Sequence, residues 1–135
     1  MAQRSDQLFP VAGHFPQQVG IDAYGNGGFR FAEMSHKGSL LCLPEGMQSW
    51  NVATADALTL ESLGPVLAQA SKLDVLLIGL GTDIVAIDPA IRQALRDHRI
   101  IIEATQTGGA VRTYNVLLAE ERAVGAALIA VEKAR

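Results

Sequence analysis

The sequence predicts one α/β domain, and three observations support that prediction. The chain has 135 residues and a mass of 14.3 kDa, which is enough for one hydrophobic core and too little for two. Its first third consists of short apolar stretches divided by turn residues, which is typical of strands joined by tight turns. The rest alternates apolar runs of strand length with segments of helical periodicity, which is typical of parallel strands connected by helices.

The domain is expected to span residues 19–135, after an N-terminal arm over residues 1–18. Pro10, Gly13 and Pro16 interrupt the arm, and its apolar residues follow no steady period. A segment of this kind lies on the surface of a domain or frays. We therefore expect the packed core to begin after the arm.

Strands are expected first. Apolar stretches cover residues 19–24, 29–34, 39–43 and 47–53, and turn residues separate the first three at 25–28 and 35–38. Phe29 and Phe31 alternate with other residue types, which places both rings on one face of their strand. Residues 40–43 show no alternation and are expected to be buried on both faces, and Pro44 ends their strand.

A helical segment is expected next, over about residues 60–70, with Thr59 as its N-cap. Gly64 and Pro65 fall inside this segment, which implies a kink or a late start to the regular turns. Residues 74–78 then form a continuous apolar strand of the kind that is covered on both faces of a parallel sheet. We expect this strand to be central.

The following helix has the clearest signals. Asp88 supplies an N-cap and Pro89 a first-turn proline, while Ile91 and Leu95 form an inward apolar stripe. Residues 100–102 are a second uninterrupted apolar strand. The order strand, helix, strand implies a right-handed parallel crossover.

A third helix is expected after the turn at residues 107–109, with Val111, Tyr114 and Leu118 on its inward face. The tail, residues 124–131, is ambiguous. Its alanines favour a helix, whereas its β-branched residues and its glycine favour a strand.

Composition and charge exclude several function classes. Eleven Lys and Arg against fourteen Asp and Glu give a net charge of −3, which disfavours nucleic-acid binding and favours a basic partner surface. No apolar run is long enough for a signal peptide or a membrane span. Cys42 is the single cysteine, which excludes an internal disulfide and fits a cytoplasmic location. Cys42 itself is expected to be a small buried side chain rather than a nucleophile.

Metal ligands and catalytic motifs are also missing from the sequence. His14, His36 and His98 lie far apart and form no chelating pair, so neither a metal nor a cofactor is expected. No nucleophile elbow, phosphate-binding loop or carboxylate pair occurs, so we expect no enzymatic activity.

Two glycine-containing turns are candidates for a ligand crevice. Each follows one of the two predicted parallel strands, and the carboxyl ends of neighbouring parallel strands are where ligands bind in open sheets. Backbone N–H groups at the start of the third helix would favour an anion. The candidate pocket residues are Gly79, Gly81, Thr82, Thr107, Gly108, Gly109, Arg112, Tyr114 and Asn115. Helix capping and close packing explain the same glycines without a ligand.

Arg112 and Asn115 share one face of the third helix and could together bind a carboxylate or a phosphate. Equally, Arg112 could form an ion pair with Glu103 or Glu121, and Asn115 could satisfy a loop carbonyl. The spacing alone leaves both roles open.

Four stretches of the chain resemble a known family. They are residues 24–30 (YGNGGFR), residues 36–41 (HKGSLL) with Pro44, residues 76–81 (LLIGLG) and residues 112–120 (RTYNVLLAE). Together they resemble the domain-of-unknown-function 498 family, which includes a mitochondrial assembly factor of respiratory complex I (NADH:ubiquinone oxidoreductase). The resemblance extends over about residues 19–131, and its R-T-Y-N stretch is the specific part.

The resemblance implies a three-layer single domain with a mixed central sheet, helices on its faces and a β-hairpin addition. It also implies that residues 123–130 form a closing strand. Val111 stands where many relatives have cysteine, which argues against thiol chemistry at the third helix. Glu121 stands where a glycine often follows the glutamate, which puts the turn geometry before Arg122 in doubt.

The expected function is protein binding without catalysis, in the assembly of complex I, with complex I subunits or assembly proteins as partners. The alternative is a binder of a small anionic ligand, or an unrecognised enzyme, that uses the crevice between residues 79–82 and 107–115. A third reading is a homo-oligomer, which an exposed apolar strand edge would mark.

Overall fold

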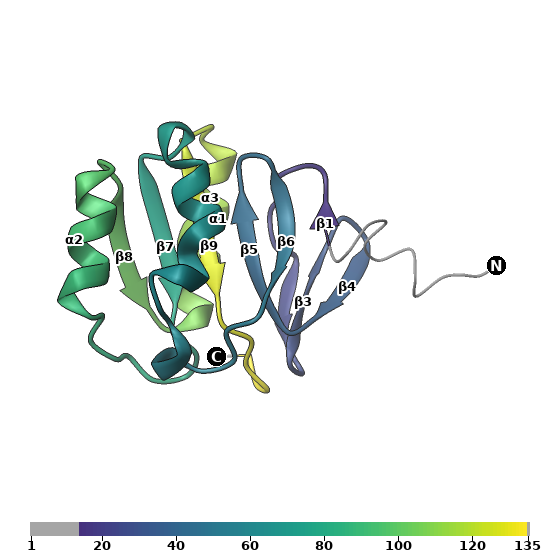
Figure 1. Cartoon of the computed structure of the whole chain (residues 1–135). Helices are drawn as coiled ribbons and strands as arrows, with labels where there is room; N and C mark the ends of the chain where they lie inside the picture. The colour runs from purple at the N-terminus through teal and green to yellow at the C-terminus, as the bar shows by residue number, and fades with distance from the viewer. Residues whose placement is uncertain (1–13, 135) are drawn as a thin grey trace.

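A six-stranded sheet forms the middle layer of the computed structural model, which describes residues 14–134 (Figure 1). In spatial order its strands are β1 (His14–Phe15), β6 (Gly46–Trp50), β5 (Ser39–Leu43), β9 (Val124–Leu128), β7 (Val75–Gly79) and β8 (Ile101–Thr105). β7 pairs in parallel with β8 and β9, whereas β5 pairs antiparallel with β6 and β9. The sheet is therefore mixed, as expected, and β7 lies in its interior.

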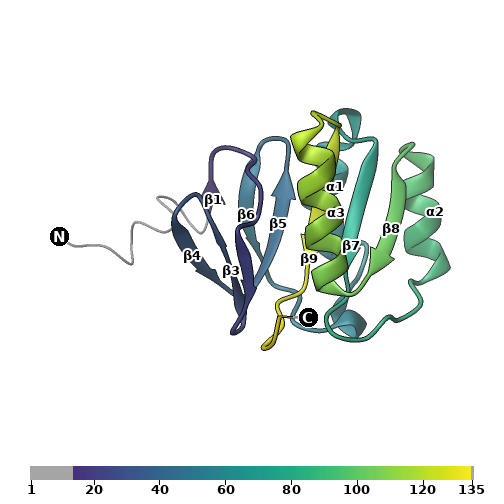
Figure 2. The ribbon, with the colours of Figure 1, turned by 180° about the vertical axis from the view of Figure 1, so that it is seen from behind.

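Helices cover both faces of this sheet (Figures 1 and 2). α3 (Thr107–Ala119) lies on one face, and α1 (Gly64–Ala68) and α2 (Pro89–Asp97) lie on the other. Three short 3₁₀ turns, Ala55–Ala57, Glu61–Leu63 and Ala70–Lys72, occur between β6 and β7. α3 is the longest helix at 13 residues, and within residues 14–134 no helix has the length and apolarity that a membrane span requires. The three-layer architecture is confirmed.

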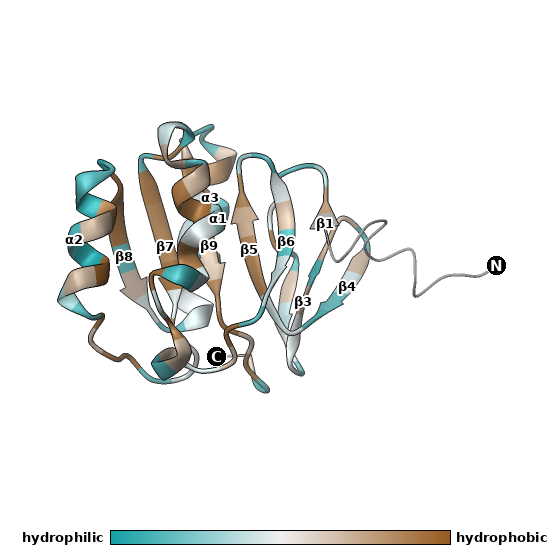
Figure 3. Cartoon of the chain, in the orientation of Figure 1, coloured by the Kyte–Doolittle hydropathy of each residue, from teal (hydrophilic) through white to brown (hydrophobic). Residues whose placement is uncertain are grey.

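The hydrophobic core has two parts, one on each side of the sheet. Alternate residues of β5 and β7 belong to different parts, so both strands are buried on both faces and apolar along their length (Figure 3). On one side they pack against Ile91 and Leu95 of α2, the stripe that the sequence predicted. On the other side they pack against Val111 and Tyr114 of α3.

The helix starts follow their local signals. The Asp88 carboxylate accepts a hydrogen bond of 2.9 Å from the N–H of Ala90, and Pro89 occupies the first turn of α2. α1 begins only at Gly64, with Pro65 in its first turn, which confirms the late start. Thr59 Oγ1 accepts from the N–H of Ser62 at 3.1 Å, but Leu60 and not Thr59 occupies the N-cap position of the 3₁₀ turn at Glu61–Leu63.

A second, three-stranded antiparallel sheet packs beside the main one and consists of β2 (Ala23–Gly25), β3 (Gly28–Phe31) and β4 (Met34–Lys37). It corresponds to the expected β-hairpin addition, with one more strand. Phe29 and Phe31 are both buried in the core part under α3, which confirms that their rings share a face.

The predicted strand at residues 29–34 and the predicted turn at 35–38 are wrong. β3 ends at Phe31, the chain turns at Ala32 and Glu33, and β4 follows. The two turn residues have φ angles of 50° and 63°, a conformation that glycine and asparagine usually supply in tight hairpins. Because neither residue type occurs there, no pattern marks this turn.

The ambiguous tail forms β9, a strand, as the family resemblance implied. It lies between β5 and β7, where both neighbours satisfy its backbone groups. Its small residues fit this crowded position, since a Cβ on Gly125 would lie 3.0 Å from Leu73 Cδ2 and 3.2 Å from the Cys42 carbonyl oxygen. Packing against two strands therefore overrides the helix propensity of the alanines.

Most of the arm expected over residues 1–18 lies outside the described residues. Within the described part, β1 pairs with β6, and the ring of Phe15 meets that of Phe31 edge to face at a centroid distance of 5.9 Å. Gln18 Nε2 donates a hydrogen bond of 2.7 Å to the carbonyl of Val124. Residues 14–18 therefore contact the main sheet and the second sheet.

Candidate functional site

The two predicted glycine turns pack directly against each other, but residues 107–109 are the first residues of α3 and not a turn that precedes it. A Cβ on Gly79, at the end of β7, would lie 2.9 Å from the Cα of Thr107, the first residue of α3. Gly109 is similarly close to Thr105, at 3.3 Å from its methyl group. Thr107 is fully buried, and Gly108 beside it is buried. The glycines here permit a close approach of backbone segments.

Thr107 joins three segments through hydrogen bonds. Its hydroxyl donates to the carbonyl of Ile129 at 2.7 Å and accepts from the N–H of Gly81 at 3.0 Å. Its own N–H donates to the carbonyl of Gly81 at 2.9 Å. The threonine therefore fastens the turn after β7 and the end of β9 to the start of α3.

Tyr114 and Asn115 of α3 hold the segment that precedes β2. The Tyr114 hydroxyl donates to the carbonyl of Val19 at 2.7 Å, and burial raises the pKa of this phenol. Asn115 makes two hydrogen bonds of 2.8 Å to the backbone of Ile21, donating from Nδ2 to the carbonyl and accepting at Oδ1 from the N–H. The structure thus shows the loop-satisfying role that the sequence left open for Asn115.

Arg112 and Thr82 are the exposed members of the predicted set. Arg112 lies on the solvent side of α3, whereas the Asn115 amide is engaged with Ile21, so the structure does not bring these two side chains to one anion site. The carbonyl of Thr82 accepts a hydrogen bond of 2.6 Å from Gln106 Nε2. The hollow left between the two turns measures about 10 Å³, which is no more than one water needs.

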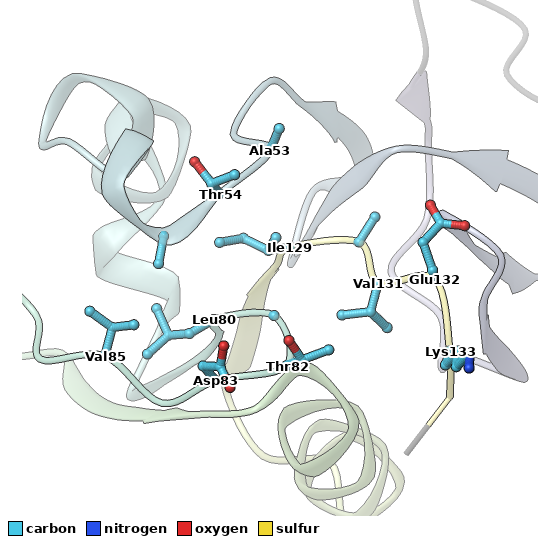
Figure 4. A pocket seen from close by; sticks show the side chains of 13 residues that line it. Ala53, Thr54, Leu80, Thr82, Asp83, Val85, Ile129, Val131, Glu132 and Lys133 are labelled. Carbon is cyan, nitrogen blue, oxygen red and sulfur yellow. The ribbon is translucent and has the colours of Figure 1, made fainter.

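A much larger pocket lies on the opposite side of the Gly81 turn, at the carboxyl ends of β7 and β9 (Figure 4). It has a volume of about 620 Å³ and is bounded by residues 53–55, residues 80–83 with Val85, and residues 129–133. Only Gly81 and Thr82 of the predicted set line it. A pocket therefore does lie at the predicted edge of the sheet, but it is next to the segment that follows β6 and not next to α3.

The walls of this pocket are mainly apolar. Leu80, Val85 and Ile129 line it (Figure 4), and Val85 is 46% exposed. Next to it in the same loop, Ile84 is 67% exposed. A second hollow of about 360 Å³ shares Leu80, Val85 and Ala55 with the first, so the two form one continuous surface. We name residues 53–58, 80–88 and 129–133 the carboxyl-edge surface.

Negative charge surrounds the apolar part of the carboxyl-edge surface. Asp83 and Glu132 line the larger hollow and Asp56 and Asp88 the smaller one, against a single cation among the described lining residues, Lys133. A hydrogen bond with Thr54 lowers the pKa of Asp56 and so stabilises its carboxylate form. The potential here favours a cationic partner.

This surface was not among the predicted sites, although one signal pointed to it. Ile84 and Val85 occur between Asp83 and Asp88 in a connection that has neither strand nor helix periodicity. Apolar residues in such a loop are either buried under it or presented to a partner. The other two segments of the carboxyl-edge surface, residues 53–58 and 129–133, are distant in sequence, and only the fold brings them next to this loop.

Two further predictions concern side chains outside this surface. Cys42 is buried in β5, as expected, and burial raises the pKa of its thiol above the ordinary value. An exposed apolar residue also occurs on a strand edge, since Ile101 of β8 is 64% exposed at the end of the main sheet. Self-association through that edge stays a prediction.

A family model described as "Protein of unknown function (DUF498/DUF598)" matches residues 21–129 of the chain. A Mus musculus protein named NADH dehydrogenase [ubiquinone] 1 alpha subcomplex assembly factor 3 is 33% identical over 85% of this chain and 62% of its own length. An uncharacterised protein of Rhodobacter capsulatus is 36% identical over 85% of this chain and 87% of its own length. The chain thus spans about three fifths of the mouse relative.

Solved structures of similar sequence have the same fold. One, described as an outer membrane protein from Bartonella henselae, superposes with a TM-score of 0.85 at 48% identity, covering 88% of this chain and 100% of that one. A Rhodopseudomonas palustris protein gives a TM-score of 0.78 at 46% identity, covering 87% of each chain. A Bordetella pertussis protein described as a Mth938-like domain gives 0.74 at 25% identity, covering 85% of this chain and 87% of that one.

Proposed function

The chain belongs to the DUF498/DUF598 family, and from that premise we propose that it is a non-enzymatic protein-binding domain that assists the assembly of respiratory complex I in the cytoplasm. Relatives named as complex I assembly factors align with 81% to 85% of this chain, which covers almost the whole domain described above. Their common part is therefore this fold, and its surfaces are the candidates for a shared role.

The observation that carries the proposal is the carboxyl-edge surface. Ile84 and Val85 expose apolar side chains beside two connected hollows of about 620 and 360 Å³. Burying a branched aliphatic side chain fully is worth about 1.5–3 kcal/mol, so covering the exposed parts of both would supply roughly 2–3 kcal/mol to a complex. A protein partner can cover such a surface, and contiguous apolar patches commonly mark interaction sites.

The carboxylates around this surface supply selectivity. Four of them, Asp56, Asp83, Asp88 and Glu132, oppose one lysine. They would attract a partner segment that combines basic and apolar side chains and repel an acidic one. Complex I subunits and other assembly proteins that expose such a segment before incorporation are the partners that this chemistry selects.

Affinity purification of the tagged full chain from the cells that make it tests the proposal. Wild type should recover complex I subunits or assembly proteins, and the double variant Ile84→Asp, Val85→Asp should lose them. Val116→Asp is the matched control, because Val116 of α3 is 56% exposed and lies outside the carboxyl-edge surface. Recovery of no complex I subunit or assembly protein by wild type, or equal recovery by the double variant, would contradict the proposal.

A further inference from the structure

The outer face of the second sheet carries a cationic hollow in an otherwise acidic chain. The hollow has a volume of about 450 Å³, and all its described lining residues come from β2, β3, β4 and the turn between β2 and β3. No residue of the main sheet is among them, whereas Arg30, Ser35 and Lys37, which are exposed, all line it. It shares no lining residue with the carboxyl-edge surface.

Strand register brings the cations of this hollow together. Ala23, Arg30 and Ser35 are directly opposite one another across the three strands. Lys37 lies two residues beyond Ser35 and therefore on the same face, opposite Gly28. All four side chains are exposed, whereas Phe29 and Phe31 point inward from the same strand. Arg30 and Lys37 are thus diagonal neighbours on one outward face.

The floor between these cations is backbone. Gly28 cannot carry a side chain, because a Cβ there would collide with the carbonyl oxygen of His36. Gly25, paired with Gly28, has a φ of 127° that side chains rarely adopt. A Cβ on Gly25 would lie 3.3 Å from the backbone nitrogen of Ala134, so this glycine permits the close approach of the C-terminal segment, and Gly28 lines the hollow with backbone alone. A ligand there can approach the backbone closely.

Arg30 is held in place from one side. Its Nη1 donates a hydrogen bond of 2.7 Å to Ser35 Oγ, and the remaining N–H groups of the guanidinium stay available. Within residues 14–134, neither Arg30 nor Lys37 forms an ion pair with a carboxylate. No Asp or Glu is among the described lining residues, and the nearby Glu132 carboxylate lies against Gly27 in the turn. Both cations therefore line the hollow, and neither is paired with a carboxylate within the described chain.

We propose that this hollow binds a small multivalent oxyanion, such as a phosphorylated or polycarboxylate metabolite. The guanidinium of Arg30 presents a planar fork that matches two oxygens of a phosphate or a carboxylate. Lys37, the diagonal neighbour of Arg30 on the adjacent strand, supplies a second point charge, which a ligand with two anionic groups satisfies better than one with a single group. A volume of about 450 Å³ fits a molecule of that size.

Titration of the ¹⁵N-labelled full chain, followed by amide chemical shifts, tests this site. Pyrophosphate and citrate are the two probes, and they separate phosphate from carboxylate ligands. With at least one probe, the amides of Gly25, Gly28, Arg30 and Lys37 should shift in a saturable way. Arg30→Gln or Lys37→Gln should weaken binding about tenfold or more, and Arg30→Lys less, because it keeps the charge and loses the fork.

Arg112→Gln is the control variant, since it removes an exposed arginine of α3 and leaves the hollow intact. Its titration should match that of wild type. Shifts that scatter over other basic residues and persist in Arg30→Gln would overturn the proposal, as would the absence of saturable shifts with both probes. A wild-type-like amide spectrum away from residues 23–37 verifies that each variant is folded.

Discussion

Thr107→Val should destabilise the protein by about 2–4 kcal/mol. Valine has nearly the shape of threonine, but it removes the hydroxyl that accepts from Gly81 N–H and donates to the Ile129 carbonyl. Thr107 is fully buried, so both backbone groups would lose their partner where water is scarce. Each unsatisfied buried group costs about 1–3 kcal/mol, and partial hydration at the end of the sheet lowers the sum of the two.

Thr107→Ser is the matched comparison, because it keeps the hydroxyl and loses one buried methyl group, at a cost of about 1 kcal/mol. The assay is urea unfolding followed by the fluorescence of Trp50, the single tryptophan, which is buried. We expect wild type to be the most stable, the serine variant to be less stable and the valine variant to be the least stable. The slope of the unfolding free energy against urea concentration should be similar in all three. A valine variant as stable as the serine variant would refute the claim that the hydrogen bonds of the Thr107 hydroxyl stabilise the contact between β7, β9 and α3.

Two further predictions concern Asn115, which is partly buried, and His36, which is buried. Asn115→Ala removes both hydrogen bonds to Ile21 and should lower the free energy of unfolding by about 1–3 kcal/mol. Hydrogen exchange at the Ile21 amide should accelerate, and unchanged exchange would argue that these two bonds do not hold the segment before β2. Burial lowers the pKa of His36 below 6.5, so the unfolded chain binds a proton that the folded chain does not as the pH falls through that value. The free energy of unfolding should therefore decline below about pH 6.5. His36→Gln should flatten that decline in unfolding curves measured from pH 7.5 to 5. If the variant shows the same decline as wild type, groups other than His36 cause the pH dependence.

The parts of the fold that the sequence predicted well depend on local signals. The predicted strand at 74–78 corresponds to β7 (Val75–Gly79), which lies inside the sheet because an uninterrupted apolar run is stable only when both faces are covered. Asp88 and Pro89 mark the start of α2 through capping and a fixed φ, which are properties of neighbouring residues alone. Such signals need no knowledge of the rest of the chain.

The parts that it predicted poorly depend on tertiary contacts. The turn at Ala32 and Glu33 adopts positive φ angles without a residue type that favours them, because pairing of β3 with β4 imposes the conformation. The sequence left both a ligand contact and close packing open for Gly79, and only the tertiary contact with Thr107 shows that its lack of a side chain serves packing. The carboxyl-edge surface joins three segments that lie far apart in sequence, so periodicity within any one of them could not reveal it.

Assembled complex I in cells that lack this chain is the most direct measure of the proposed function. Native gel electrophoresis with an NADH dehydrogenase stain should show that assembled complex I is lost, and that wild type and Val116→Asp restore it. The double variant Ile84→Asp, Val85→Asp should accumulate as a folded protein and fail to restore the complex. Normal complex I without the chain, or full restoration by the double variant, would contradict the account.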